Sequence, residues 1–367
     1  MTVPPPRASA STPSRLYFVG PWVDLACAGG LSIAVFTGLR AWFDGQASPA
    51  AAQLAALLLW VVNWPHFSAT SYRLYHRREN VMQYPITAAF TPLLVLLGVL
   101  ASFGYPERVA PYFVKLFLIW SPYHFSGQTL GITLLYARRA GVPVGPLARR
   151  GLVVFVFGSF LTQTLRFESG VLGSAYFGVP YPAFGVPSWT VDAALAGTWL
   201  GGIAFLGLTL RACRAVGRRL APIVLIPSVA QFIWFVPGSG EAAFLEFVPA
   251  FHSLQYLLIA WGIQLQERLD AAPRRASGRF VGYETARWYA INVAGGALLF
   301  WLLPRIFSWG AGTDLLFASG VVLAGVQIHH FFVDGVIWKL RHASVFSPLM
   351  VSLDDMLAPR AAPAGAA

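Results

Sequence analysis

Five histidines lie inside long apolar segments of the chain: His66, His124, His252, His329 and His330. An ionisable side chain is costly inside a membrane, so it usually faces the protein interior and has a partner there. Imidazole is a good ligand for iron, copper and zinc. We therefore predict that these five side chains form a buried metal site. The alternative is that each serves as an interhelical hydrogen-bonding group.

Polar residues at helical spacing from these histidines form the predicted second layer of the site. Residues three or four positions apart share one face of a helix. An amide or carboxylate commonly holds the far nitrogen of a metal-bound imidazole. The predicted set is Asn63, Gln128, Gln255, Tyr256 and Asp334, of which Asp334 could instead be a direct ligand.

The composition determines which kind of protein must position these residues. Of 367 residues, 56% are hydrophobic and only 11% are charged, whereas a soluble domain carries roughly 25% charged residues. Most of the surface must therefore face lipid. The net charge of +11 does not indicate a nucleic-acid partner, because the charges stand in short clusters between apolar runs. Membrane lipids and a hydrophobic small molecule are the expected partners, and the sequence predicts no oligomeric state.

Ten apolar runs are long enough to be transmembrane helices. Every second loop between them is rich in arginine, which the positive-inside rule assigns to the cytoplasm. We expect an all-α integral membrane protein of about ten transmembrane helices with both termini cytoplasmic. It would comprise an N-terminal tail (1–20), a membrane domain (21–340) and a partly disordered C-terminal tail (341–367). The predicted spans are 22–43, 49–74, 81–103, 111–137, 150–166, 190–211, 220–237, 241–266, 285–304 and 312–338.

The five histidines fall on spans that all run toward the cytoplasm, so their side chains can converge. Counting about 1.5 Å per residue from the cytoplasmic arginines and lysine gives two tiers of histidines about 5–9 Å apart. A proline precedes three of the histidines, which favours kinked helices around a cavity. The segment 167–189, rich in glycine, proline and aromatic residues, is interpreted as an interfacial aromatic belt or as a lid over a lipid-facing cavity.

Few carboxylates accompany the histidines, so a carboxylate-rich di-iron bundle is disfavoured. A histidine-ligated non-haem iron site fits better, with copper as an alternative, and its apolar surroundings suit oxygen chemistry on a lipid-soluble substrate. A second hypothesis is a haem-binding cytochrome with paired histidine ligands. A third is a proton-coupled transporter that uses intramembrane histidine and aspartate. Motifs for nucleotide hydrolysis or serine-hydrolase chemistry are absent from the sequence.

The repeated His-Phe pairs (His66-Phe67 and His124-Phe125) and the His329-His330 pair resemble polytopic membrane oxygenases. The family most similar in layout is the Brp/Blh type of bacterial carotene dioxygenase. The resemblance covers the histidine-bearing helices only, and the chain is longer than that family usually is. It implies non-haem iron, dioxygen, an isoprenoid or other lipid substrate, and the five histidines as the ligand set. We accordingly expect a location in the bacterial inner membrane.

Overall fold

The computed structural model describes residues 16–43, 49–170, 175–272, 277–338 and 347–357. These residues are helical almost throughout, with one short antiparallel hairpin of β1 (Ala175–Tyr176) and β2 (Val179–Pro180). The all-α prediction is therefore confirmed. The longer helices are α2 (Leu31–Phe43), α3 (Pro49–Leu58), α4 (Trp64–Tyr75), α6 (Thr91–Gly104), α7 (Ala110–Arg139), α8 (Pro146–Glu168), α9 (Trp189–Ala215), α10 (Ile226–Phe235), α12 (Val248–Ala271), α13 (Gly278–Ala297), α14 (Leu303–Ala311) and α15 (Leu315–Ile337).

Shorter helical pieces extend or join these helices. Four of them are π-helical turns that continue directly into an α-helix, and such turns are frequent at functional sites. The short pieces are α1 (Pro21–Leu25), η1 (Ala26–Gly30), η2 (Leu59–Asn63), α5 (Arg78–Gln83), η3 (Ile86–Phe90), η4 (Pro222–Val224), η5 (Gly238–Gly240), α11 (Ala242–Leu245), η7 (Leu298–Leu302), η8 (Pro348–Met350) and α17 (Leu353–Leu357).

Seven helical segments of the described chain are long and apolar enough to cross a membrane. This supports a multi-pass membrane protein. The other three predicted spans coincide with α7, α8 and α10. Helices α7 and α8 have 30 and 23 residues, but α10 has 10 residues and is only about 15 Å long. The seven qualifying segments are Pro21–Trp42, Pro49–Tyr75, Ile86–Gly104, Trp189–Ala215, Ala242–Ala271, Gly278–Ala311 and Leu315–Ile337.

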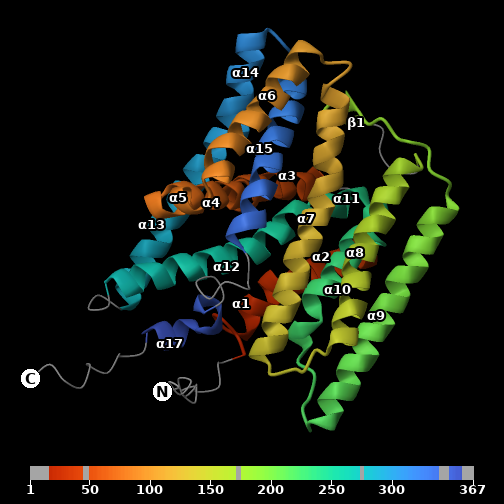
Figure 1. Cartoon of the computed structure of the whole chain (residues 1–367), viewed down its shortest axis with the longest axis vertical. Coiled ribbons are helices and arrows are strands. Elements are labelled where there is room, and N and C mark those ends of the chain that lie inside the picture. The colour runs from red at the N-terminus through yellow and green to blue at the C-terminus, as the bar shows by residue number, and fades with distance from the viewer. Residues whose placement is uncertain (1–15, 44–48, 171–174, 273–276, 339–346, 358–367) are drawn as a thin grey trace, which may run out of the picture.

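The helices that carry the histidines cross one another. In Figure 1, α7 and α15 run along the long axis of the molecule, whereas α3, η2 and α4 run across it, and α12 also runs obliquely across. Helix α15 contacts both α7 and α4, and α12 contacts η2 and α4. This crossing brings the middle of α7 and the C-terminal half of α15 against the first turns of α4 and α12.

Close helix packing depends on glycine where backbones touch. Helices α8 and α9 form an antiparallel hairpin whose helices approach at Gly151 and Gly201. A Cβ atom at Gly201 would lie 2.6 Å from the backbone nitrogen of Phe155, and one at Gly151 would lie 2.8 Å from that of Phe205. Small residues at such contacts are typical of membrane helices.

The segments before α1 and after α15 lie together at one end of α7. The guanidinium of Arg139 donates hydrogen bonds to the carbonyl oxygens of Tyr17 (2.9 Å) and Leu349 (2.6 Å). The backbone nitrogen of Leu353 donates to the carbonyl of Phe18 (2.8 Å). The beginning and the end of the described chain are therefore on the same side of the molecule.

The β-hairpin packs across α15 at the opposite end. Its two-residue turn has positive φ at Phe177 (49°) and Gly178 (76°), which is the type I′ pattern favoured in tight hairpins. Phe177 lies directly over Gly320 of α15. The described part of segment 167–189 contributes no residue to the lining of the cavity near the histidines.

Candidate metal centre

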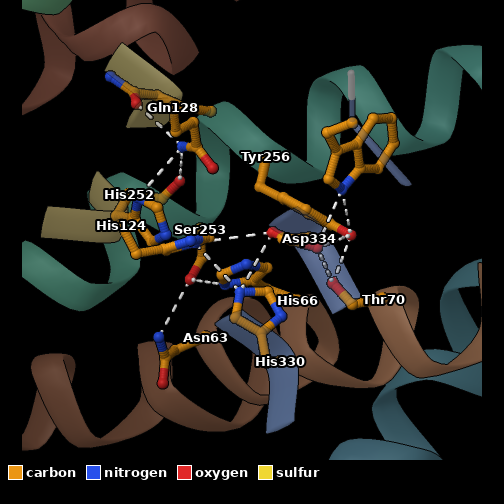
Figure 2. Close-up of polar contacts among 12 residues, drawn as sticks. Asn63, His66, Thr70, His124, Gln128, His252, Ser253, Tyr256, His330 and Asp334 are labelled. Atoms are coloured by element: carbon orange, nitrogen blue, oxygen red, sulfur yellow. Dashed lines mark hydrogen bonds and ion pairs between the residues drawn. The ribbon is translucent and has the colours of Figure 1, made fainter. Parts of the chain in front are cut away.

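Four of the five predicted histidines meet at the point where the helices cross. They are His66 of α4, His124 of α7, His252 of α12 and His330 of α15, and one ring nitrogen of each lies within 4.8 Å of the others. His66, His252 and His330 are at most 2% exposed, and His124 is only slightly more accessible. Figure 2 shows the four rings pointing toward one another. Four separate helices thus contribute one imidazole each.

Local sequence explains how these helices present their histidines. Pro65 and Pro249 lie in the first turns of α4 and α12, where the missing amide proton costs little. Pro122 lies inside α7, two residues before His124, and there it removes one helical hydrogen bond. The π-helical turn η2 ends immediately before α4. The three prolines therefore lie where α4, α7 and α12 present their histidines to the cluster.

The tautomer of His66 follows from the hydrogen bonds around Ser253. The hydroxyl of Ser253 donates its only proton to the carbonyl of Pro249, at 2.7 Å. The same hydroxyl lies 2.9 Å from Nδ1 of His66. In the arrangement in which it donates to Pro249, it accepts from Nδ1, and Nε2 of His66 keeps a free lone pair. Nε2 is buried and has no protein hydrogen-bond partner, which suits a metal ligand.

His124 and His330 face each other beside a carboxylate. Their Nε2 atoms are 3.2 Å apart. Asp334 Oδ2 lies 3.3 Å from Nε2 of His330 and 3.6 Å from Nε2 of His124. The prediction that Asp334 adjoins the site is confirmed by these distances. A cation bound between the two nitrogens would also be stabilised by the carboxylate.

His252 is positioned by an amide chain. Nε2 of Gln128 lies 3.1 Å from Nδ1 of His252, 3.0 Å from its carbonyl oxygen and 3.1 Å from Oε1 of Gln255. Gln255 in turn donates to the carbonyl of Ala28, at 2.8 Å. An amide nitrogen only donates, so Nδ1 of His252 accepts from Gln128, and the neutral ring carries its proton on Nε2, which is buried without a protein partner. Metal binding through this Nε2 would require the ring proton on Nδ1 and the Gln128 amide turned so that its oxygen faces that proton. Gln128 was predicted to support His124 on its own helix, but it reaches across to His252 instead.

A second layer of polar groups lies one helical turn beyond the histidines. Each member is four residues after a histidine, so it occupies the same face of its helix. Oδ1 of Asp334 accepts from Trp338 Nε1 (3.0 Å) and lies 3.1 Å from the hydroxyl of Thr70 and 3.4 Å from that of Tyr256. Thr70 and Tyr256 also share a short hydrogen bond (Figure 2), so one of the two hydroxyls donates to the other and the second donates to Asp334. The layer comprises Thr70, Gln128, Tyr256 and Asp334.

The histidine cluster satisfies the elementary requirements of a metal site. Three buried ring nitrogens, Nε2 of His66, Nε2 of His252 and Nδ1 of His330, have no partner among the described residues, although buried polar atoms are normally hydrogen-bonded. The other ring nitrogen of His330, Nε2, is the one that faces His124 and Asp334. Metal–nitrogen bonds of about 2.0–2.1 Å would place two ligand nitrogens at most about 4.2 Å apart. The observed limit of 4.8 Å is only slightly wider. Small ring movements would therefore close the cluster around one ion.

His329 is outside the cluster, which corrects the predicted five-histidine set. Its ring stacks on Tyr75, with 6.3 Å between the ring centroids, and its Nε2 lies 3.4 Å from the tyrosine hydroxyl. Adjacent residues of a helix point about 100° apart, so His329 and His330 cannot both face one ion. The predicted two tiers are also wrong, because the four rings meet within 4.8 Å. Residue counts along crossing helices do not measure depth along a shared axis.

The remaining predicted residues lie around the cluster, and three contributors were missed. Asn63 donates to Ser253 Oγ (3.0 Å), so it supports His66 through the serine. Thr70 could have been found, because it follows His66 by the same four residues as the other second-layer groups. Ser253 and Trp338 carried no comparable spacing signal, since Ser253 acts on a different helix and Trp338 acts through Asp334.

A cavity of about 400 Å³ opens beside the cluster. Its walls come from α7, α8, α12 and α15 and are mostly aromatic and aliphatic. His124, Gln128, Tyr256 and Asp334 line it as well, so the cavity reaches one histidine and most of the second layer. A volume of this size lies within the range of about 300–1,000 Å³ that is typical of small-molecule sites.

Comparison with known proteins returned no relative. The chain matches no protein-family model, no curated protein and no solved structure. The function is therefore argued from the four-histidine cluster and its surroundings.

Proposed function

We propose that this chain is a membrane-embedded oxidoreductase that holds non-haem iron with His66, His124, His252 and His330. Its substrate is a lipid or isoprenoid molecule that reaches the metal through the adjacent cavity. The observation that carries the proposal is the convergence of four imidazoles, with one ring nitrogen of each within 4.8 Å of the others, beside a largely apolar cavity. When bound, non-haem iron supplies one-electron and dioxygen chemistry.

The protein residues have separate roles in this proposal. The four imidazoles hold the metal, and Ser253 keeps His66 in the tautomer that leaves Nε2 available. Asp334 places a carboxylate beside two ligand nitrogens. The apolar walls of the cavity exclude water and hold the substrate beside the metal. Tyr256 and Thr70, bonded to Asp334, fix the orientation of that carboxylate.

A haem cytochrome is disfavoured by the same geometry. Bis-histidine ligation requires two imidazoles on opposite faces of a flat porphyrin about ten ångströms across. Here the space beside each pair of histidines is filled by the other pair, because all four nitrogens lie within 4.8 Å. A compact metal ion is the cofactor that this arrangement accommodates.

We further propose ten membrane crossings with both chain ends in the cytoplasm of a bacterial cell. The hydrogen bond between Leu353 and Phe18 supports an even number of crossings, because it joins the beginning and end of the described chain. The seventh crossing would combine η4, α10 and η5, since α10 alone spans about half of a hydrocarbon core of about 30 Å. Cysteine substitution at Glu107 should give labelling from the periplasm, and substitution at Arg219 should give labelling from the cytoplasm only.

Isotope incorporation tests the oxygenase activity. Iron-loaded protein in lipid nanodiscs, with a chemical reductant, would be exposed to ¹⁸O-labelled dioxygen and a bacterial lipid extract. We expect labelled oxygen in one class of apolar lipid, and none with the His124→Ala variant. Iron-loaded protein that leaves every lipid unlabelled would contradict the oxygenase proposal.

A further inference from the structure

The cavity beside the cluster has a definite direction along α7. Its lining on this helix begins at Trp120 and ends at Leu135. At about 1.5 Å per residue, it extends about 16 Å from His124 toward Leu135 but only about 6 Å toward Trp120. The distal part is apolar, with Ile132 and Ile259 among its walls. The histidine cluster therefore lies near one end of this elongated cavity, which we call the chamber.

Two glycines leave the chamber wide in its polar section, where His124, Gln128 and Asp334 line it. A Cβ atom built on Gly127 or on Gly335 would meet no atom within 4 Å, and both residues line the cavity. These glycines differ from Gly151 and Gly201, whose Cβ atoms would collide with a neighbouring helix. Glycine inside a helix costs up to about 1 kcal/mol relative to alanine. At Gly127 and Gly335 the space that a side chain would occupy belongs to the chamber.

The side-chain oxygen of Gln128 faces the same polar section of the chamber. Nε2 of Gln128 lies within 3.1 Å of three acceptor atoms of His252 and Gln255, among which its two protons are shared. Oε1 of Gln128 has no hydrogen-bond partner among the described residues, and Gln128 lines the cavity. In Figure 2 this oxygen points away from the amide's contacts. An alcohol would pair with this end of the amide, because a hydroxyl can donate to the oxygen of Gln128 and can equally accept from its nitrogen when the amide is turned.

We propose that the chamber binds one long aliphatic chain that carries a hydroxyl group near one end. The hydroxyl would pair with Gln128, the short end would lie toward Trp120, and the long end would follow α7 toward Leu135. Gly127 and Gly335 would leave room for the chain beside the hydroxyl group. This inference rests on the proposed function, because it names the substrate class and predicts that reaction occurs near a chain end.

Photolabelling tests the chamber directly. The probe is a long-chain primary alcohol with a diazirine midway along the chain, added to purified protein in nanodiscs and mapped by peptide mass spectrometry. We expect cross-links on the distal walls, around Ile132, Leu135 and Ile259. The Gly127→Leu and Gly335→Leu variants should each lower this labelling about ten-fold or more, because a filled cavity resists further packing. Gly127→Ala should give an intermediate loss.

Gly197 offers the matched control. It lies inside α9, its Cβ would also meet nothing within 4 Å, and it does not line the cavity, so Gly197→Leu should leave labelling unchanged. Thermal unfolding of each variant verifies folding. Labelling that persists in both Gly127→Leu and Gly335→Leu, or that falls equally in Gly197→Leu, would contradict the proposal that the chamber binds a long aliphatic chain.

Metal content measured in the same samples separates this inference from the proposed function. Glycine-dependent labelling in a protein that binds no metal would support the chamber and refute the metal centre. Stoichiometric metal without labelling of the distal walls would support the metal centre and refute the chamber.

Discussion

The hydroxyl of Ser253 lies 2.9 Å from Nδ1 of His66 and 2.7 Å from the carbonyl of Pro249. When its proton goes to Pro249, the serine accepts from the histidine, and this arrangement leaves Nε2 free to bind a metal. The residue before it, His252, presents its own ring to the same cluster. One short stretch of α12 thus supplies a ligand and also fixes the tautomer of a ligand on α4.

Replacing Ser253 by alanine should weaken metal binding without abolishing it. The change removes the acceptor for Nδ1 of His66, and losing a partner of this kind typically costs about 10–100-fold in metal affinity. Competition with a chromophoric chelator would measure the affinity. Ser253→Thr retains the hydroxyl and is the matched control. Equal affinity of the alanine variant and the wild type would show that the serine does not control the His66 tautomer.

The neighbouring histidines His329 and His330 should behave differently. His330→Ala removes a clustered imidazole and should reduce bound metal to a small fraction of the wild-type content, whereas His329→Ala should retain it. The physical reason is that His330 faces the cluster and His329 stacks on Tyr75. Elemental analysis of the two purified variants makes the comparison, and equal losses would argue against the four-histidine set.

Asp334→Asn should lower metal affinity by about 10-fold or more, since it removes the negative charge beside two ligand nitrogens. Asparagine has nearly the same shape, so folding should be preserved. The same chelator competition, with circular dichroism as the folding control, tests this expectation. Unchanged affinity would limit Asp334 to a structural role among Thr70, Tyr256 and Trp338.

A buried ion pair outside the metal centre should make the fold acid-sensitive. Lys115 Nζ lies 2.9 Å from Glu168, and both side chains are at most 7% exposed. Burial alone would raise the pKa of Glu168, but hydrogen bonds from Tyr181, Lys115 and the Phe184 amide outweigh burial and lower it. The stabilising contribution is therefore complete above the unfolded pKa of about 4.3 and is lost as the pH falls toward the lower folded value.

Glu168→Gln should destabilise the protein by about 3–5 kcal/mol at neutral pH, because it leaves the Lys115 charge buried without its carboxylate. The double variant Lys115→Met/Glu168→Leu should recover most of this loss and should flatten the acid limb of the stability profile. Thermal unfolding in detergent at several pH values gives both results. A single variant as stable as the wild type would show that water solvates the lysine.

The sequence was sufficient for the membrane class and for most of the site. Low charge and alternating arginine-rich loops predicted a helical membrane protein. Four of the five predicted histidines lie together in one cluster. The errors over Gln128, Ser253 and depth arise from the crossing of α4 and α12 with α7 and α15 (Figure 1). Residue spacing describes one helix face only, so it could not show that Gln128 reaches His252 or that Ser253 lies against His66. The error over His329 has another cause, because adjacent residues of one helix point about 100° apart.

Metal analysis with an optical spectrum tests the central claim most directly. The protein would be purified in detergent after anaerobic, iron-supplemented expression, together with the His330→Ala and His329→Ala variants. The proposed function predicts stoichiometric iron without a Soret band in the wild type and in His329→Ala, and little iron in His330→Ala. A Soret band, or wild-type protein without metal after this preparation, would contradict it.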